Sequence, residues 1–294
     1  RIYEAKGRPS DNPLIIHVPS AAWLERYCVE VPPCAYQLAE RFWPGPLTMI
    51  LKRNPVLPDC TTGGLDTVGV RCPAHPVTLA LIEAAGVPIA APSANRSGRP
   101  SCTTAQHVLE DVGGKIECVL DGGPCAVGVE STILDLTVTP PRLLRPGGVT
   151  LSQLRQVLGQ VEVDPAVLHQ MEAGQKAASP GMKYKHYSPA ADVVIVDASP
   201  EDYVEYVNQK GDGWALCFED VPLLQVPTMA YGTRYDSASQ AHRLFEALHQ
   251  LDEAGASRAY ARLPRKRGVG LAVYNRLIRA AAFQVVNPKG RHIV

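Results

Sequence analysis

The sequence has few of the features that mark several common classes of protein. Aromatic residues are 6% of the 294 residues, and no apolar run approaches the roughly 18 residues that a membrane-spanning helix needs. The first residues lack the apolar core of a signal peptide. Lys plus Arg and Asp plus Glu each number 29, and zero net charge argues against a protein that coats nucleic acid through bulk charge. We therefore expect no membrane partner. The eight cysteines are interpreted as reduced thiols of a cytosolic protein, so a cytoplasmic protein is expected.

Motifs for the common cofactors and metals are also missing. There is no G-x-x-x-x-G-K-[ST] loop for ATP, no G-x-G-x-x-G fingerprint for a dinucleotide, and no H-E-x-x-H or G-x-S-x-G motif. None of the eight cysteines has C-x-x-C spacing, so no zinc site is predicted. We therefore expect the functional residues in polar clusters where strands end and loops begin.

What the sequence does contain is an alternation of short apolar strands and helices, which favours an α/β fold. In the first part we expect strands at residues 14–18, 47–51, 68–71, 88–91, 116–120 and 132–136. Helices are expected there at 35–42 and 77–85, from the cap Ser101 to about 112, and from the cap Thr150 to about 159. In the second part we expect strands at 192–196, 214–218 and 258–263, and helices after the cap Ser199 and at 236–254 and 269–282.

The two parts are separated by a segment of small, polar and helix-breaking residues, GQKAASPG at 174–181, which is typical of a linker. We predict a larger domain at 1–174, a linker or lid at 175–190, and a small α/β domain at 191–294. The end of the linker carries Tyr184, His186 and Tyr187 between prolines. It is either a lid that folds over a cleft or a linker packed between domains.

Two loops of the first domain have the composition of an anion-binding site. Lys6 and Arg8 stand two residues apart in a Gly/Pro-rich loop, which suits phosphate, although a solvated basic turn has the same spacing. The loop APSANRSG at 91–98 supplies Ser93 and Asn95 just before a helix N-terminus, where free amide donors favour phosphate. A plain capping loop remains the alternative.

Further polar residues lie at predicted strand ends, where ligands of open α/β sheets gather. Arg71 ends one strand, Ser131 begins another, and Arg145 follows two leucines. Together with the two loops they predict a cleft for anionic ligands. The basic stretch RLPRKR at 262–267 is interpreted as a solvated loop and not as an RNA site.

Several short sequence segments, taken in their order along the chain, resemble those of a known protein family. They are KGRPSDNPLIIHV at 6–18, FWPGPLT at 42–48, TVGVR at 67–71, APSAN at 91–95, EST at 130–132 and RPG at 145–147. This set resembles the YrdC-like threonylcarbamoyl-adenylate synthases. The linker and the additional C-terminal domain resemble the longer, two-domain type, so the resemblance covers essentially the whole chain.

The resemblance implies a twisted open mixed sheet with a concave charged cleft, followed by a smaller Rossmann-like α/β domain. It implies a nucleotidyltransferase that converts L-threonine, bicarbonate or CO2, and ATP with Mg²⁺ into threonylcarbamoyl-adenylate and pyrophosphate. The product feeds the threonylcarbamoylation of tRNA by a separate transferase complex. Binding of tRNA to this chain is expected to be weak or indirect.

The resemblance also implies roles for individual residues. Lys6, Arg8, Ser93 and Asn95 match catalytic positions beside the ATP phosphates. The positions matching nucleotide contacts are Arg8, Asn12, Thr67, Ala91, Ser93, Ser101, Arg145, Tyr184, His186 and Tyr187. The positions matching threonine contacts are His17, Arg71 and Ser131. No protein ligand for a metal is implied.

One departure and two alternatives accompany this interpretation. The family has an upstream strand and a T-x-Y-G-L-type motif that helps to hold the amino acid, whereas this sequence begins at or just after it, so we expect weakened substrate binding and poor activity. A relative that forms carbamoyl-adenylate is disfavoured by the absence of C-x-x-C motifs. A double-stranded-RNA-binding module without catalysis is disfavoured by the zero net charge.

Overall fold

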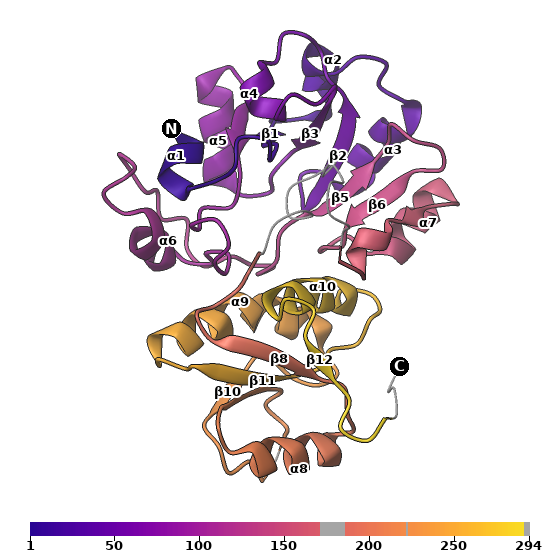
Figure 1. The fold of residues 1–294 in the computed structure, drawn as a ribbon. Coiled ribbons are helices and arrows are strands. Elements are labelled where there is room, and N and C mark those ends of the chain that lie inside the picture. The colour runs from indigo at the N-terminus through magenta and orange to yellow at the C-terminus, as the bar shows by residue number, and fades with distance from the viewer. Residues whose placement is uncertain (171–185, 222, 291–294) are drawn as a thin grey trace. The chain divides into compact units, whose positions relative to one another are not determined.

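A computed structural model describes residues 1–170, 186–221 and 223–290 of the chain (Figure 1). These residues form two compact units. Unit 1 holds residues 1–94, 120–122 and 130–170, and unit 2 holds 95–119, 123–129, 186–221 and 223–290. The predicted boundaries at 174/175 and 190/191 stay a prediction, because most of the linker lies outside the described residues. No helix in the described ranges is long and apolar enough to cross a membrane.

Unit 1 is built on a seven-stranded sheet with the order β4-β1-β3-β2-β5-β6-β7. The strands are β1 (Ile15–His17), β2 (Leu47–Lys52), β3 (Thr67–Arg71), β4 (Ile89–Ala91), β5 (Thr132–Asp135), β6 (Arg142–Arg145) and β7 (Glu162–Val163). The pairs β1/β3, β2/β5 and β6/β7 are parallel and the other neighbours are antiparallel. The predicted open mixed sheet is therefore confirmed.

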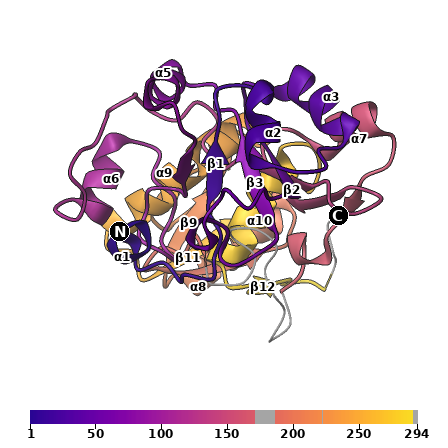
Figure 2. The ribbon, with the colours of Figure 1, turned by 90° about the horizontal axis from the view of Figure 1, so that it is seen from above.

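The helices of unit 1 are α1 (Ile2–Lys6), α2 (Leu24–Tyr27), α3 (Pro33–Phe42), α4 (Asp59–Thr62), α5 (Pro76–Ala85) and α7 (Leu151–Leu158), with short 3₁₀ turns η1 (Ala21–Trp23) and η2 (Pro165–Val167). Figure 2 shows α2, α3 and α7 grouped beside one face of the sheet. Against them pack Ile16, Met49 and Val70, which are almost fully buried. Because side chains alternate along a strand, Ile15 and Ile50 point to the opposite face, where the apolar cluster is small.

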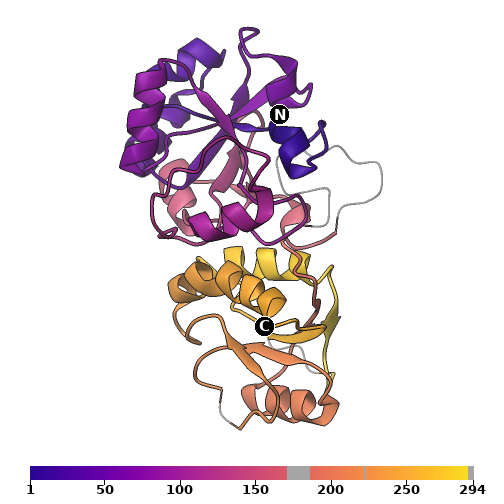
Figure 3. The ribbon, with the colours of Figure 1, turned by 90° about the vertical axis from the view of Figure 1, so that its left-hand side faces the viewer.

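Unit 2 contains a five-stranded, all-parallel sheet with the order β10-β9-β11-β8-β12. Its strands are β8 (Asp192–Val196), β9 (Trp214–Cys217), β10 (Thr228–Ala230), β11 (Arg258–Arg262) and β12 (Val285–Val286). Its helices are α6 (Ala105–Val112), α8 (Pro200–Lys210), α9 (Ser237–Glu253) and α10 (Gly270–Ala280). Figures 1 and 3 show α9 and α10 on one face and α8 on the other. The predicted second α/β domain is confirmed.

The core of unit 2 follows from the alternation along β8. Val193 and Ile195 pack in the cluster that includes Leu244 and Leu248 of α9. Val194 packs on the other face in the cluster that includes residues of α8. A parallel strand covered by helices on both faces has to be apolar throughout, and the sequence VVIV meets that demand.

Local helix signals were mostly reliable guides. Thr150 and Gln153 form the two reciprocal hydrogen bonds of a capping box at α7, and Ser199 Oγ accepts from Asp202 N at α8. Gly86 ends α5 in the left-handed conformation.

Two predicted elements are wrong. The N-cap of α6 is Thr104, whose side chain accepts from His107 N over 3.3 Å, and not Ser101. Both hydroxyls fit the cap preference, but the helix begins three residues later than expected. The predicted strand at 116–120 is irregular, and Leu120 is 65% exposed. Its apolar side chains therefore gain little of the burial that stabilises a strand.

Candidate functional site

The first predicted cation, Lys6, lies at the end of a short helix. α1 ends at Gly7, whose φ of 60° lies in the left-handed region that glycine adopts without strain. Lys6 is 7% exposed, and its Nζ donates to the carbonyl oxygen of Ser93 over 2.6 Å. Two predicted site segments that are 87 residues apart in the sequence therefore meet in unit 1.

Arg8 is fixed by the loop that follows it. Its Nε donates to the carbonyl oxygen of Asn12 over 3.2 Å, and its Nη2 donates to that of Pro13 over 2.8 Å. Arg8 and Asn12 are 9% and 4% exposed. Within the described part of the chain, Asn12 Oδ1 has no hydrogen-bond donor. An unsatisfied buried polar atom costs about 1–3 kcal/mol, so this oxygen is available as a hydrogen-bond acceptor.

His17 and Arg71 lie side by side, because β1 and β3 pair in parallel with these two residues in register. The Nδ1 of His17 lies 3.2 Å from the carbonyl oxygen of Ile89. Burial lowers the pKa of His17 to about 4, and the charge of Arg71 is the second cause of this shift. The ring is therefore neutral near pH 7, and since a carbonyl only accepts, Nδ1 carries the proton and Nε2 the lone pair. Arg71 Nε donates to the carbonyl oxygen of Gly45 over 2.9 Å.

Because of a β-bulge, Arg145 projects from the same face of the sheet as Ile15 and Ile50. The register between β5 and β6 shifts at Ile133, and Arg145 lies opposite that residue. Residues directly opposite one another project to the same face, and Ile133 belongs to the cluster with Ile15 and Ile50. A regular ladder would direct Arg145 to the other face, so the bulge determines the direction of this side chain.

Arg145, Ser131 and Thr48 form a buried chain of hydrogen bonds. Arg145 donates from Nε to the Ser131 carbonyl over 3.0 Å and from Nη2 to the Ser131 hydroxyl over 3.1 Å. That hydroxyl lies 2.8 Å from Thr48 Oγ1. Thr48 is fully buried and was missed as a site candidate. The available signal was a single hydroxyl inside the otherwise apolar strand LTMIL.

Thr67 and Ala91 lie on the strands beside these residues. Thr67 begins β3 and lines a small hollow with Ile15, Ile50 and Gly69. Ala91 ends β4 and pairs with Ile15. A Cβ at Gly69 would lie 3.2–3.3 Å from side-chain atoms of Ile15, Ile50 and Thr48. Glycine at position 69 therefore lets these three side chains approach the β3 backbone closely, on the face that carries the predicted residues.

The remaining predicted residues belong to unit 2, and Tyr184 lies outside the described residues. Asn95 is 6% exposed, and its Nδ2 donates to the carbonyl oxygens of Arg96 and Arg99 over 2.8 and 3.0 Å. Ser101 is buried, and its carbonyl oxygen lies 3.2 Å from a nitrogen of His249.

The two described aromatic residues of the predicted lid differ in exposure. Tyr187 is 5% exposed, and its ring packs 5.3 Å from that of Phe245 in the core of unit 2. The ring of His186 lies 5.5 Å from that of Tyr187, and His186 is half-buried. The Tyr187 side chain is therefore part of a hydrophobic core, which leaves little of its surface for a ligand.

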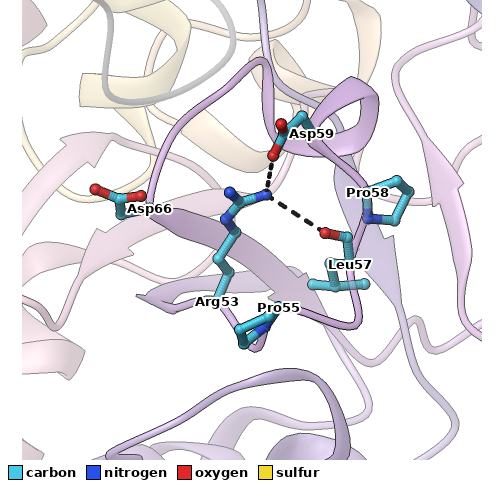
Figure 4. Close-up of a pocket in the computed structure, with 6 residues that line it drawn as sticks. All are labelled: Arg53, Pro55, Leu57, Pro58, Asp59 and Asp66. Carbon is cyan, nitrogen blue, oxygen red and sulfur yellow. Dashed lines mark hydrogen bonds and ion pairs between the residues drawn. The ribbon is translucent and has the colours of Figure 1, made fainter.

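A larger hollow of about 430 Å³ is lined by the segment that connects β2 to β3 and contains none of the predicted residues (Figure 4). Arg53 projects into it and pairs with Asp59 over 2.6 Å. Asp66 and three apolar residues, Pro55, Leu57 and Pro58, complete the lining. Because Asp59 compensates the Arg53 guanidinium, this lining offers no uncompensated positive charge for an anionic ligand.

In the ranges 1–170, 186–221 and 223–290, no three His, Cys, Asp or Glu residues come together in a way that could hold a metal ion. The described residues therefore do not fit a resident metal centre. The predicted Mg²⁺ stays a prediction.

Comparison with protein families identifies both halves of the chain. Residues 1–147 match the family described as telomere recombination, which covers Sua5, YciO and YrdC proteins. Residues 149–282 match the C-terminal domain of threonylcarbamoyl-AMP synthase.

Individual relatives agree over almost the whole length. The chain is 46% identical to a threonylcarbamoyl-AMP synthase from Pyrococcus abyssi, over 97% of this chain and 85% of that protein. It is 43% identical to the enzyme of the same name from Bacillus subtilis, over 97% of this chain and 84% of that protein. A crystal structure of P. abyssi Sua5 in complex with L-threonine superposes with a TM-score of 0.89 and 44% identity, covering 98% and 85% of the two chains.

Proposed function

Because this chain belongs to the two-domain threonylcarbamoyl-AMP synthase family, we propose that it forms threonylcarbamoyl-AMP and pyrophosphate from L-threonine, bicarbonate or CO2, and ATP. The product is an activated acyl-adenylate that serves tRNA modification. We propose that a separate transferase complex consumes it, in which case this chain needs no strong tRNA site of its own.

The observation that carries the proposal is the way in which four cations of unit 1 are fixed. Lys6, Arg8, Arg71 and Arg145 each donate to a backbone carbonyl oxygen over 2.6–3.2 Å. None of these side chains is left to move freely in solvent, and three are at most 9% exposed. Cations that are already oriented stabilise developing charge without reorganisation at the moment of reaction.

The reaction requires that kind of arrangement. The threonine amine and bicarbonate first form a carbamate with loss of water. A carbamate oxygen then attacks the α-phosphorus of ATP, a new P–O bond forms, and pyrophosphate leaves with the electron pair of the broken P–O bond. Both partners are anions, so the protein has to hold them in line and reduce their repulsion. No protein nucleophile takes part.

The roles in unit 1 follow from position and chemistry. We assign the ATP phosphates to Lys6 and Arg8, with Ser93 beside them, and the threonine carboxylate to Arg71. Neutral His17, with its Nε2 lone pair, suits an ammonium or hydroxyl donor of threonine. Asn12 Oδ1 suits a donor on the nucleotide, and Thr67 and Ala91 are assigned to the same ligand.

Ser131 and Arg145 are assigned to threonine and to the nucleotide respectively. Their direct hydrogen bonds join the two sets of residues.

In unit 2, Asn95, Ser101 and His186 retain their assignment to the nucleotide as part of the proposal. Tyr187 retains it only for the small part of its surface that the core leaves exposed, and Tyr184 lies outside the described residues. Mg²⁺ enters with ATP and neutralises part of the triphosphate charge. No step of the proposed mechanism depends on a protein ligand for it.

The proposal is tested by pyrophosphate release from ATP, with the adenylate detected by mass spectrometry. Release should require both L-threonine and bicarbonate, and the product should have the mass of threonylcarbamoyl-AMP. Release that is unchanged when threonine is omitted would contradict the proposal. Turnover with carbamoyl phosphate in place of threonine and bicarbonate would instead favour a carbamoyl-adenylate-forming enzyme.

A further inference from the structure

Helix α9 in unit 2 carries a stripe of polar side chains that the proposed function does not use. His242, Glu246, His249 and Asp252 follow one another at spacings of four, three and three residues, so they lie on one side of the helix. We call these four residues the polar stripe. The apolar residues of α9, among them Leu244 and Leu248, pack in the core of unit 2.

Every member of the polar stripe contacts the segment between residues 95 and 129. His242 Nδ1 lies 3.2 Å from the carbonyl oxygen of Ala126. Glu246 lies 3.4 Å from His107 Nε2. His249 and Asp252 contact the loop that begins at Asn95. One helix of the C-terminal sequence therefore supports a long segment of the N-terminal sequence.

Asp252 ties this loop to the end of the linker. Its Oδ2 pairs with Arg99 Nη2 over 3.4 Å, and its Oδ1 accepts from Ala190 N over 2.6 Å. The Asp252 side chain is 12% exposed, and hydrogen bonds to an ionised group are stronger than those between neutral groups. The two segments also contact each other directly, since Ser188 N donates to the carbonyl oxygen of Gly98 over 2.9 Å.

The Arg99 contact extends into the loop itself. Arg99 Nη1 donates to Asp111 Oδ1 over 2.8 Å, and Asp111 Oδ2 accepts from Arg96 N over 2.9 Å. Asn95 Nδ2 donates to the carbonyl oxygens of Arg96 and Arg99. The Asn95 amide, the Arg99 guanidinium and the Asp252 carboxylate therefore form one connected network.

His249 fixes the far end of the same loop. Its Nε2 lies 3.2 Å from the carbonyl oxygen of Ser101, and its ring stacks on that of His107 with centroids 3.9 Å apart. Thr103 N donates to His107 Nδ1 over 3.3 Å, so His107 carries its proton on Nε2, toward Glu246. Both histidines are 5% exposed.

We propose that the polar stripe, chiefly through its last residue Asp252, positions the Asn95–Ser101 loop and the Ser188–Ala190 segment for binding of the nucleotide. This inference rests on the proposed function, because it is that function which assigns Asn95, Ser101 and the neighbouring His186 to ATP. Asp252 touches neither substrate in this account. It is a positioning residue, and it gives the C-terminal domain a defined part in substrate affinity.

The test compares Asp252→Ala and Asp252→Asn with the wild-type chain by calorimetric titration of a non-hydrolysable ATP analogue and, separately, of L-threonine. Asp252→Ala should weaken analogue binding roughly tenfold, as loss of a charged hydrogen bond does, and change the threonine Kd less than twofold. Asp252→Asn keeps an acceptor for Ala190 N, so its analogue Kd should rise only about threefold. In the turnover assay the same variants should raise the KM for ATP and not that for threonine.

Asp212→Ala is the matched control. Asp212 is also an aspartate of unit 2 that pairs with an arginine, Arg258, over 2.9 Å, but it is not part of the polar stripe. Its analogue Kd should equal that of the wild type. The inference is overturned by an unchanged analogue Kd in Asp252→Ala, by equal losses for analogue and threonine, or by a wild type that does not bind the analogue. Should Asp252→Ala not fold, an unchanged Kd in Asp252→Asn overturns it. Threonine-dependent pyrophosphate release by the wild type tests the proposed function separately.

Discussion

Arg145 donates two hydrogen bonds to one residue, Ser131, one to its carbonyl oxygen over 3.0 Å and one to its hydroxyl over 3.1 Å. The first fixes the guanidinium against the backbone, and the second orients the hydroxyl. Because the proposal assigns Arg145 to the nucleotide and Ser131 to threonine, a change at either residue should be felt by both substrates.

Removing the third member of this chain gives the first prediction. Thr48→Val keeps the shape of the side chain and deletes the hydroxyl that lies 2.8 Å from Ser131 Oγ. Loss of one buried hydrogen bond costs about 1 kcal/mol, so the KM for threonine should rise roughly fivefold, with a similar loss of folding free energy. Steady-state kinetics and urea unfolding measure the two effects. Thr228→Val, at an exposed position in β10, should change neither, and an unaltered KM in Thr48→Val would show that the Ser131 hydroxyl needs no orientation.

Arg8 and Arg71 should separate the two substrates. Arg71→Ala should raise the KM for threonine more than that for ATP, and Arg8→Ala should do the reverse. Hydrogen bonds to charged groups contribute about 1.5–3 kcal/mol, which corresponds to a rise of roughly ten- to a hundredfold. Thermal melting of both variants controls for unfolding, since each arginine also holds a backbone carbonyl. If both variants shift the KM of the same substrate, the assignment of roles is wrong.

His17 should make folding stability depend on pH. Burial and Arg71 lower its pKa from 6.5 to about 4, so between these values the unfolded chain binds a proton that the folded chain does not. The stability contributed by neutral His17 is thus complete above pH 6.5 and is lost as the pH falls toward 4. The loss approaches about 3 kcal/mol, from 1.36 kcal/mol per pKa unit.

Urea unfolding at several pH values measures this effect. His17→Gln should show a shallower fall in unfolding free energy between pH 6.5 and 4 than the wild type. Burial and the nearby His107 also lower the pKa of His249, but that residue is present in both proteins, so the difference between them isolates His17. Parallel curves for the two proteins would mean that His17 titrates normally in the folded chain.

Local signals explain most of what the sequence predicted correctly. The cap Thr150, the cap Ser199 and the terminal Gly86 act within one turn of their helices, so a few neighbouring residues suffice to recognise them. The prediction of Ser101 as a cap is wrong because Thr104, three residues later, satisfies the same preference and accepts the hydrogen bond from His107 N.

Non-local relationships explain what the sequence left out. The direction of Arg145 depends on a register shift against β5, and Thr48 becomes relevant only because Ser131, 83 residues away, pairs with it. The support of the Asn95–Ser101 loop by Asp252 joins residues 153 apart at the Arg99 contact. The spacing of residues within one helix or strand cannot predict contacts between residues so far apart in the sequence. The family resemblance gave candidate residues, but the contacts that hold them come from the folded chain.

The last prediction concerns two glycines that border the Ser131 region. A Cβ at Gly147 would lie 2.3 Å from Thr132 N and 2.7 Å from Glu130 O, which are backbone atoms that cannot yield without moving the strand. A Cβ at Gly69 would lie 3.2–3.3 Å from side-chain atoms of Ile15, Ile50 and Thr48, which can shift by a few tenths of an ångström without moving the backbone. Gly147→Ala should therefore lower the free energy of unfolding by at least about 3 kcal/mol, and Gly69→Ala by about 1 kcal/mol.

Urea unfolding of both variants measures this ranking, and Pro146→Ala controls for a general sensitivity of the RPG turn. Because Gly147 lies against residues 130–132, Gly147→Ala should also weaken threonine binding in any fraction that folds. Equal losses of unfolding free energy in Gly147→Ala and Gly69→Ala would show that the backbone beside Ser131 can move. In that event the fixed geometry of Arg145 and Ser131 could not be what sets the affinity for threonine.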